Sequence, residues 1–108
     1  MSIVPKFKCI VTVTKNGLGT EVVHAARSKG AQGGTIIKGR GTSDAEIKHL
    51  FNMFIEPDKE IVLIVIEEDK LKPVKEAIHH KINFNKVGQG ILFVLDVEDA
   101  IGVLREIK

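Results

Sequence analysis

Apolar and β-branched residues gather in four short runs along the chain, each about as long as a β-strand. The runs span residues 6–14, 33–38, 59–67 and 91–97. In the third run, every position of residues 61–66 is apolar. A continuous apolar run is typical of a strand that is covered on both faces, so we expect this strand in the middle of a sheet.

Two segments between these runs show helical periodicity instead. One spans residues 20–28 and is followed by Gly30, a residue type that commonly ends helices. The other spans residues 69–82 and presents one apolar face, formed by Val74, Ala77, Ile78 and Ile82.

The resulting order is strand, helix, strand, strand, helix, strand. It predicts an α+β fold, the ferredoxin-like split βαβ sandwich, as a single domain over residues 1–108. Two helices then cover one face of a four-stranded sheet. A chain of 108 residues has little left to cover the other face. We therefore expect oligomerisation through that open face.

The segment between the two central strands, residues 42–58, has a pattern of its own. Ser43 and Glu46 have the spacing of a capping box, and Pro57 would end a helix. Apolar residues recur between them at helical spacing: Ile47, Leu50, Phe51 and Phe54. The pattern predicts a short amphipathic helix over residues 43–56. Its apolar stripe either packs on the chain's own sheet or contacts a neighbouring subunit or a partner protein.

Composition narrows the class of protein. Sixteen basic and 14 acidic residues give a net charge of +2, which is not typical of proteins held on nucleic acid by charge. The single cysteine, Cys9, cannot form an internal disulfide. No apolar run approaches the length of a membrane span, and the N-terminus lacks the pattern of a signal peptide. We expect a cytoplasmic protein without membrane insertion.

Motifs for catalysis or metal binding are absent from the sequence. His79 and His80 are adjacent on an expected helix, so they point about 100° apart and make a poor metal-binding pair. No Ser or Cys stands in a motif that would activate it, and no CxxC, HExxH or EF-hand spacing occurs. We predict no catalytic residue, no metal site and no enzyme activity.

The placement of glycine is more informative. Six of the ten glycines lie at the expected ends of strands: Gly33, Gly34, Gly39, Gly41, Gly88 and Gly90. Glycine lets backbone N–H groups approach an anion closely, but it equally serves tight turns. One Gly-x-Gly loop is a weak signal. Two of them, at residues 39–41 and 88–90, beside strands that we expect to pair, favour a ligand site.

These stretches together resemble the PII nitrogen-regulatory signalling proteins and their PII-like relatives. The resemblance is carried by GGTIIKGRG at residues 33–41, by EIVLIVIEEDKL after Pro57, and by GQGILFVLDV at residues 88–97. It spans nearly the whole chain, from Lys6 to about Val103. Its most specific part is the pattern GxGxxFVxDV.

The resemblance implies a homotrimer that regulates a membrane transporter or a metabolic enzyme, with nitrogen control as the candidate process. Such proteins have no obligatory cofactor and bind ATP or ADP as a signalling ligand, in clefts between subunits; AMP is a further candidate here. By resemblance, residues 39–58 form the T-loop, which engages the partner, and residues 83–90 form the B-loop. The implied nucleotide-binding residues are Gly33, Gly34, Thr35, Lys38, Gly39, Gly41, Gly88, Gln89 and Gly90.

The chain departs from the family pattern at positions that contact phosphate or magnesium. Thr42 and Ser43 replace an Arg and a Gln at the base of the T-loop, and Asp58 and Ile91 replace two lysines. Two tail arginines are replaced by Gly102 and Leu104, and without any Tyr the chain cannot be uridylylated. These losses should weaken triphosphate binding unless other cations substitute, namely Lys38, Arg40, Lys48, Lys86 or Arg105.

One alternative function stays open at this point, and a second is disfavoured. The chain would alternatively be a ligand-free trimer of the same fold that binds a partner through the expected helix at residues 43–56, with Ile47, Leu50, Phe51 and Phe54 as its contact surface. An RNA-binding domain is disfavoured, because stacking on RNA needs aromatic side chains on the central strands, and those strands hold only Phe7.

Overall fold

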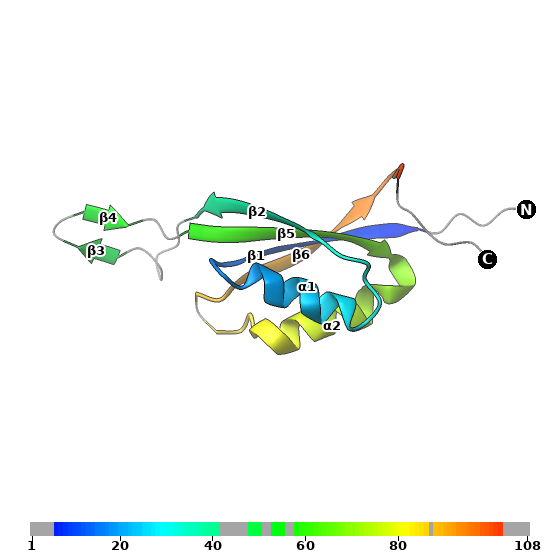
Figure 1. Cartoon of the computed structure of the whole chain (residues 1–108), viewed down its shortest axis with the longest axis horizontal. Coiled ribbons are helices and arrows are strands. Elements are labelled where there is room, and N and C mark those ends of the chain that lie inside the picture. The colour runs from blue at the N-terminus through cyan, green and yellow to red at the C-terminus, as the bar shows by residue number, and fades with distance from the viewer. Residues whose placement is uncertain (1–5, 42–47, 51–52, 56–57, 87, 103–108) are drawn as a thin grey trace, which may run out of the picture.

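A four-stranded antiparallel sheet carries two helices on one face in the computed structural model of the chain (Figure 1). The structure describes residues 6–41, 48–50, 53–55, 58–86 and 88–102. The sheet has the order β2-β5-β1-β6 and consists of β1 (Phe7–Lys15), β2 (Thr35–Arg40), β5 (Asp58–Glu67) and β6 (Gly90–Val97). The helices are α1 (Gly19–Arg27) and α2 (Leu71–Ile82), and a 3-10 turn (Glu68–Lys70) precedes α2. The expected element order and the ferredoxin-like fold are confirmed.

The hydrophobic core lies between the helices and one face of the sheet. Because side chains alternate along a strand, every second residue of the apolar run in β5 points to the helices. Val62, Ile64 and Ile66 are therefore buried and pack with Ile10 of β1. The helices contribute their buried positions to the same cluster, which are Val22, Ala26, Val74, Ile78 and Ile82.

The opposite face of the sheet is apolar, and no other described part of the chain covers it. The registers place Cys9, Val65 and Leu95 side by side, and Val11, Leu63 and Phe93 in the next row. Large side chains remain exposed on this face: Ile37 by 42%, Val65 by 43%, Ile91 by 55%, Phe93 by 41% and Leu95 by 50%. The central position of β5 is confirmed, but only one of its faces is covered by the chain itself.

The expected helix at residues 43–56 is wrong where the structure describes this segment. Lys48–Leu50 forms β3 and Met53–Ile55 forms β4, and the two pair as an antiparallel hairpin. The hairpin projects beyond the sheet at the end where β2 leaves and β5 returns (Figure 1). A helix of so few residues is marginal in water unless its apolar face is buried, and a segment projecting beyond the sheet meets no such surface there. Ser43, Glu46, Ile47, Phe51 and Pro57 lie outside the described residues.

Gly90 begins β6 in a conformation that other residues adopt only with strain. Its φ is +133°, and a Cβ on it would lie 2.0 Å from the carbonyl oxygen of Val13 on the paired strand. The close approach of the two strands therefore requires glycine here, with or without a ligand.

Gly90→Ala should lower the free energy of unfolding by more than about 1 kcal/mol, because the methyl group collides with β1 and the φ is unfavourable. Gly33→Ala is the matched control, because nothing lies within 4 Å of a Cβ at Gly33. Urea unfolding of both variants and the wild type measures the difference. Equal stability of the two variants would contradict the role assigned to Gly90.

Candidate functional site

The candidate nucleotide-binding residues occupy three places on the sheet. Gly39 pairs with Lys59 of β5, and Gly90 pairs with Thr14 of β1, so both Gly-x-Gly loops lie at the same end of the sheet. They are on opposite edges, however, because β5 and β1 separate β2 from β6. At the usual strand spacing this places them about 14 Å apart. Gly33, Gly34 and Thr35 form the third group at the other end of β2, since Thr35 pairs with Leu63.

An open hollow lies at the end of β2, beside the base of the expected T-loop. Its volume is ≈ 410 Å³, and its lining residues are Asn16, Lys38, Gly39, Arg40 and Asp58. Three of these follow one another along β2, and Asp58 is the cross-strand partner of Arg40. The hollow is therefore lined by two of the expected site residues, Lys38 and Gly39. Arg40 adds a second positive charge to the lining, and Asp58 adds a carboxylate.

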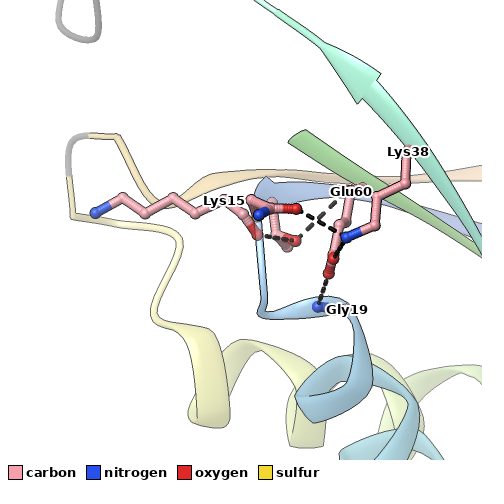
Figure 2. Close-up of polar contacts among 6 residues, drawn as sticks. Lys15, Gly19, Lys38 and Glu60 are labelled. Carbon is pink, nitrogen blue, oxygen red and sulfur yellow. Dashed lines mark hydrogen bonds and ion pairs between the residues drawn. The ribbon is translucent and has the colours of Figure 1, made fainter. Parts of the chain in front are cut away.

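A buried carboxylate adjoins this hollow. Glu60 of β5 is 5% exposed and accepts a 2.6 Å hydrogen bond from the backbone N–H of Gly19, the first residue of α1. The same carboxylate pairs with the ammonium of Lys38, which also donates a 2.9 Å hydrogen bond to Oδ1 of Asn16. Figure 2 shows the Glu60 carboxylate between the backbone N–H of Gly19 and the ammonium of Lys38. Glu60 thus links β5, β2 and the N-terminus of α1.

The environment of Glu60 favours its ionised form. The Lys38 ammonium, and next the Gly19 N–H, hold the pKa of the Glu60 carboxyl below its ordinary value although burial opposes them. A carboxylate at the first turn of a helix is further stabilised by the helix dipole. The neighbouring Lys59 is 6% exposed, and burial, followed by the nearby Lys15 charge, lowers the pKa of its ammonium.

Sequence reasoning did not identify Glu60, although strand periodicity contained the signal. Side chains alternate between the two faces of a strand, and Glu60 lies two residues before Val62 and four before Ile64. Its side chain must therefore face the helices, as theirs do. A charged residue on the buried face of a strand requires a partner. Lys38 pairs with Glu60 in the register of β2 and β5, and it supplies that partner.

The loop before β6 uses its side chains to hold the end of α2. Gln89 donates a 2.8 Å hydrogen bond through Nε2 to the carbonyl of Ile82, the last residue of α2. Asn83 follows in the left-handed conformation, with φ of 59°, and Gly88 has φ of 84°. Gln89 and Gly88 therefore have local structural roles, whether or not a ligand binds.

The remaining site predictions stay predictions. Leu50 and Phe54, expected to contact a partner, lie in β3 and β4, while Ile47 and Phe51 fall outside the described residues. Gly41 follows β2, where a Cβ would lie 3.3 Å from Cγ of Lys59. Within the described part of the chain, no three His, Cys, Asp or Glu side chains are grouped to hold a metal ion. No helix among the described residues is long and apolar enough to span a membrane.

Glu60→Ala should lower the free energy of unfolding by about 1–3 kcal/mol near pH 7, because it leaves the buried Gly19 N–H without its acceptor. Since the pKa of Glu60 is lowered on folding, its stabilisation is complete above the unfolded-state pKa and is lost as pH falls through the folded-state pKa. Urea unfolding from about pH 7 to about pH 3 should show the difference from wild type shrinking in acid.

The control for this experiment is Asp96→Ala, which removes an exposed ion pair with Lys8 and should change stability little. A Glu60→Ala effect that stays constant down to the acid limit would contradict the assignment.

Comparison with known proteins identifies the family of this chain. The family described as Nitrogen regulatory protein P-II matches residues 7–107. Among solved structures, the crystal structure of Arabidopsis thaliana PII bound to citrate is similar, with 25% sequence identity and a TM-score of 0.70. That likeness covers 92% of this chain and 84% of the Arabidopsis chain. Comparison with the curated proteins found no match. Since the family match covers nearly the whole chain, the protein belongs to the P-II family of nitrogen regulatory proteins.

Proposed function

We propose that this chain is a P-II-type signalling regulator that assembles as a homotrimer, binds an adenine nucleotide between subunits and controls a partner protein through residues 39–58. The observation that carries the proposal is the division of the glycine loops between opposite edges of one sheet. Within one chain, Gly39 and Gly90 lie on opposite edges of the sheet with β5 and β1 between them, so they do not line one common cleft. Two copies placed edge to edge can form one cleft from the β2 edge of one and the β6 edge of the other.

The uncovered face of the sheet supports assembly. Its exposed side chains form a continuous apolar surface over all four strands, including Ile37, Val65, Ile91 and Phe93. Monomeric soluble proteins rarely leave so large an apolar patch in water. Packing the same face from three copies around an axis covers it and sets the strand edges of neighbouring copies side by side.

Two of the candidate glycines support ligand approach at the β2 edge. A Cβ at Gly33 would meet nothing within 4 Å, and one at Gly39 would make only an ordinary 3.5 Å contact with Ile61. Internal packing therefore does not require glycine at either position. The Arabidopsis relative was crystallised with citrate, a small anion, which supports a small-molecule ligand here as well.

The β3–β4 hairpin supports contact with a partner, because it projects from the body of the protein beyond the ends of β2 and β5 (Figure 1). A ligand at the base of residues 39–58 would act directly on the segment that carries the hairpin. Regulation of a transporter or metabolic enzyme, in place of catalysis, is the proposed outcome.

A ligand-free trimer that binds its partner through residues 43–56 is the second candidate function. The observation that favours it is the balance of charge at the hollow, where Lys38 is already paired with Glu60. In that case the apolar residues of β3 and β4 would form the partner-binding surface, as a hairpin in place of the expected helix.

Phe93→Asp should convert the trimer to a monomer, because it buries three carboxylates in the shared apolar face. His80→Asp introduces the same charge at an exposed site on α2, on the opposite layer, and should leave the trimer intact. Light scattering coupled to size-exclusion chromatography measures the mass. A wild-type monomer at micromolar concentration would overturn the proposed assembly.

Titration calorimetry with ATP, ADP, AMP and cyclic AMP should detect binding of at least one of them. Gly39→Val should weaken that binding by roughly tenfold or more, because its side chain would occupy space in the hollow at the end of β2. Its stability should stay close to that of the wild type, since a Cβ at Gly39 makes only an ordinary 3.5 Å contact with Ile61. If none of the four nucleotides binds the trimer, the ligand-free function replaces the first proposal.

A further inference from the structure

Lys38 is the lysine best placed to bind an anion in the hollow at the end of β2, but its charge is already engaged. Its ammonium pairs with the carboxylate of Glu60 and donates to Oδ1 of Asn16. The two members of the ion pair differ greatly in burial: the Lys38 side chain is 68% exposed and the Glu60 side chain is 7% exposed. The lysine thus lies at the surface of the hollow, and its counter-ion lies beneath it.

Glu60 is the fixed member of this pair. It is held by the backbone N–H of Gly19 at 2.6 Å and lies on a central strand of the sheet. A Cβ on Gly19 would lie 2.6 Å from Oε1 of Glu60, so the carboxylate sits directly against the first turn of α1. An anion that enters the hollow can displace the exposed Lys38 side chain, but it cannot displace the carboxylate.

Two carboxylates offset the cations of the described residues at the hollow. Lys38, Arg40 and Asp58 line it, and Glu60 lies behind Lys38. The carboxylates reduce the attraction that Lys38 and Arg40 would otherwise exert on a polyphosphate. Each further negative charge on a ligand adds repulsion from Glu60, which is shielded from water, whereas a ligand of low charge is affected little.

We propose that Glu60 is a specificity-determining internal counter-ion, which holds Lys38 and makes the hollow select ligands with few negative charges over polyphosphates. For nucleotides, this deepens the function proposed above and rests on it: a monophosphate or cyclic monophosphate is preferred over a triphosphate. The ligand chemistry is a phosphate monoester or diester of low charge, positioned by backbone N–H groups and Arg40.

The test uses Glu60→Gln, which removes the charge but keeps an oxygen that can accept from the Gly19 N–H. Inorganic triphosphate is the probe, and binding is followed by the amide chemical shifts of Lys38, Gly39 and Arg40. We expect Glu60→Gln to bind triphosphate roughly tenfold more tightly than the wild type, and AMP no more than about twofold more tightly, because the repulsion grows with ligand charge.

Asp96→Asn is the matched control. It makes the same change of charge at the exposed Lys8–Asp96 pair, at the other end of the sheet, and should leave triphosphate affinity at the wild-type value. An equal gain in both variants would show a general effect of net charge and would overturn the proposal. Unchanged affinity in Glu60→Gln, or no triphosphate binding by it, would also overturn the proposal.

The outcomes separate this inference from the proposed function. If triphosphate binds more tightly to Glu60→Gln while no adenine nucleotide binds either protein, nucleotide binding fails and the counter-ion role stands. If adenine nucleotides bind and the ratio of ATP to AMP affinity is the same in both proteins, the function stands and the counter-ion role fails.

Lys38→Gln keeps the test decisive if Glu60→Gln does not fold. Because this substitution leaves the Glu60 carboxylate without its counter-ion, triphosphate should bind roughly tenfold more weakly, whereas the affinity for AMP should change by less than about twofold. An equal loss for both ligands, or no loss for triphosphate, would show that Glu60 does not discriminate by ligand charge, and the proposal would be wrong.

Discussion

The sheet of this protein is apolar on both faces, and the helices of the described residues cover one of them. Val62, Ile64 and Ile66 are buried beneath α1 and α2, while Val65 and Phe93 face outward on the other side. This imbalance is the constraint on which the rest of the architecture depends. In the proposed trimer, other copies cover the open face, and edge-to-edge neighbours bring the two groups of candidate site residues together.

Periodicity predicted the body of the fold because the sheet and the helices bury regular apolar patterns. It failed at Lys48–Leu50 and Met53–Ile55, where Leu50 and Phe54 match helical spacing but lie in two short strands. Spacing alone says nothing about whether a surface exists for an apolar stripe to pack on. The position of this segment beyond the sheet is set by tertiary structure. Tertiary structure therefore determines whether the segment forms a helix or a hairpin, and the spacing of apolar residues does not.

The strand ends that carry the candidate site residues were predictable from the sequence, but the charge pairing around them was not. The glycine loops indicated which ends of the strands to examine, yet Gly90 is required by its contact with Val13 and Gln89 by its bond to Ile82. The pairing of Lys38 with Glu60 depends on strand register, which the sequence does not state. A lysine counted from sequence as a phosphate ligand is, in the folded chain, already neutralised.

The open apolar face has a further consequence if other copies cover it. Ile91 and Leu95 would then gain much of their burial only on association, so folding and assembly would share one driving force. The measured stability of such a protein is not a property of the chain alone but varies with its concentration. A substitution on this face would seem harmless in a concentrated sample and severe in a dilute one, without any change in the structure of the subunit.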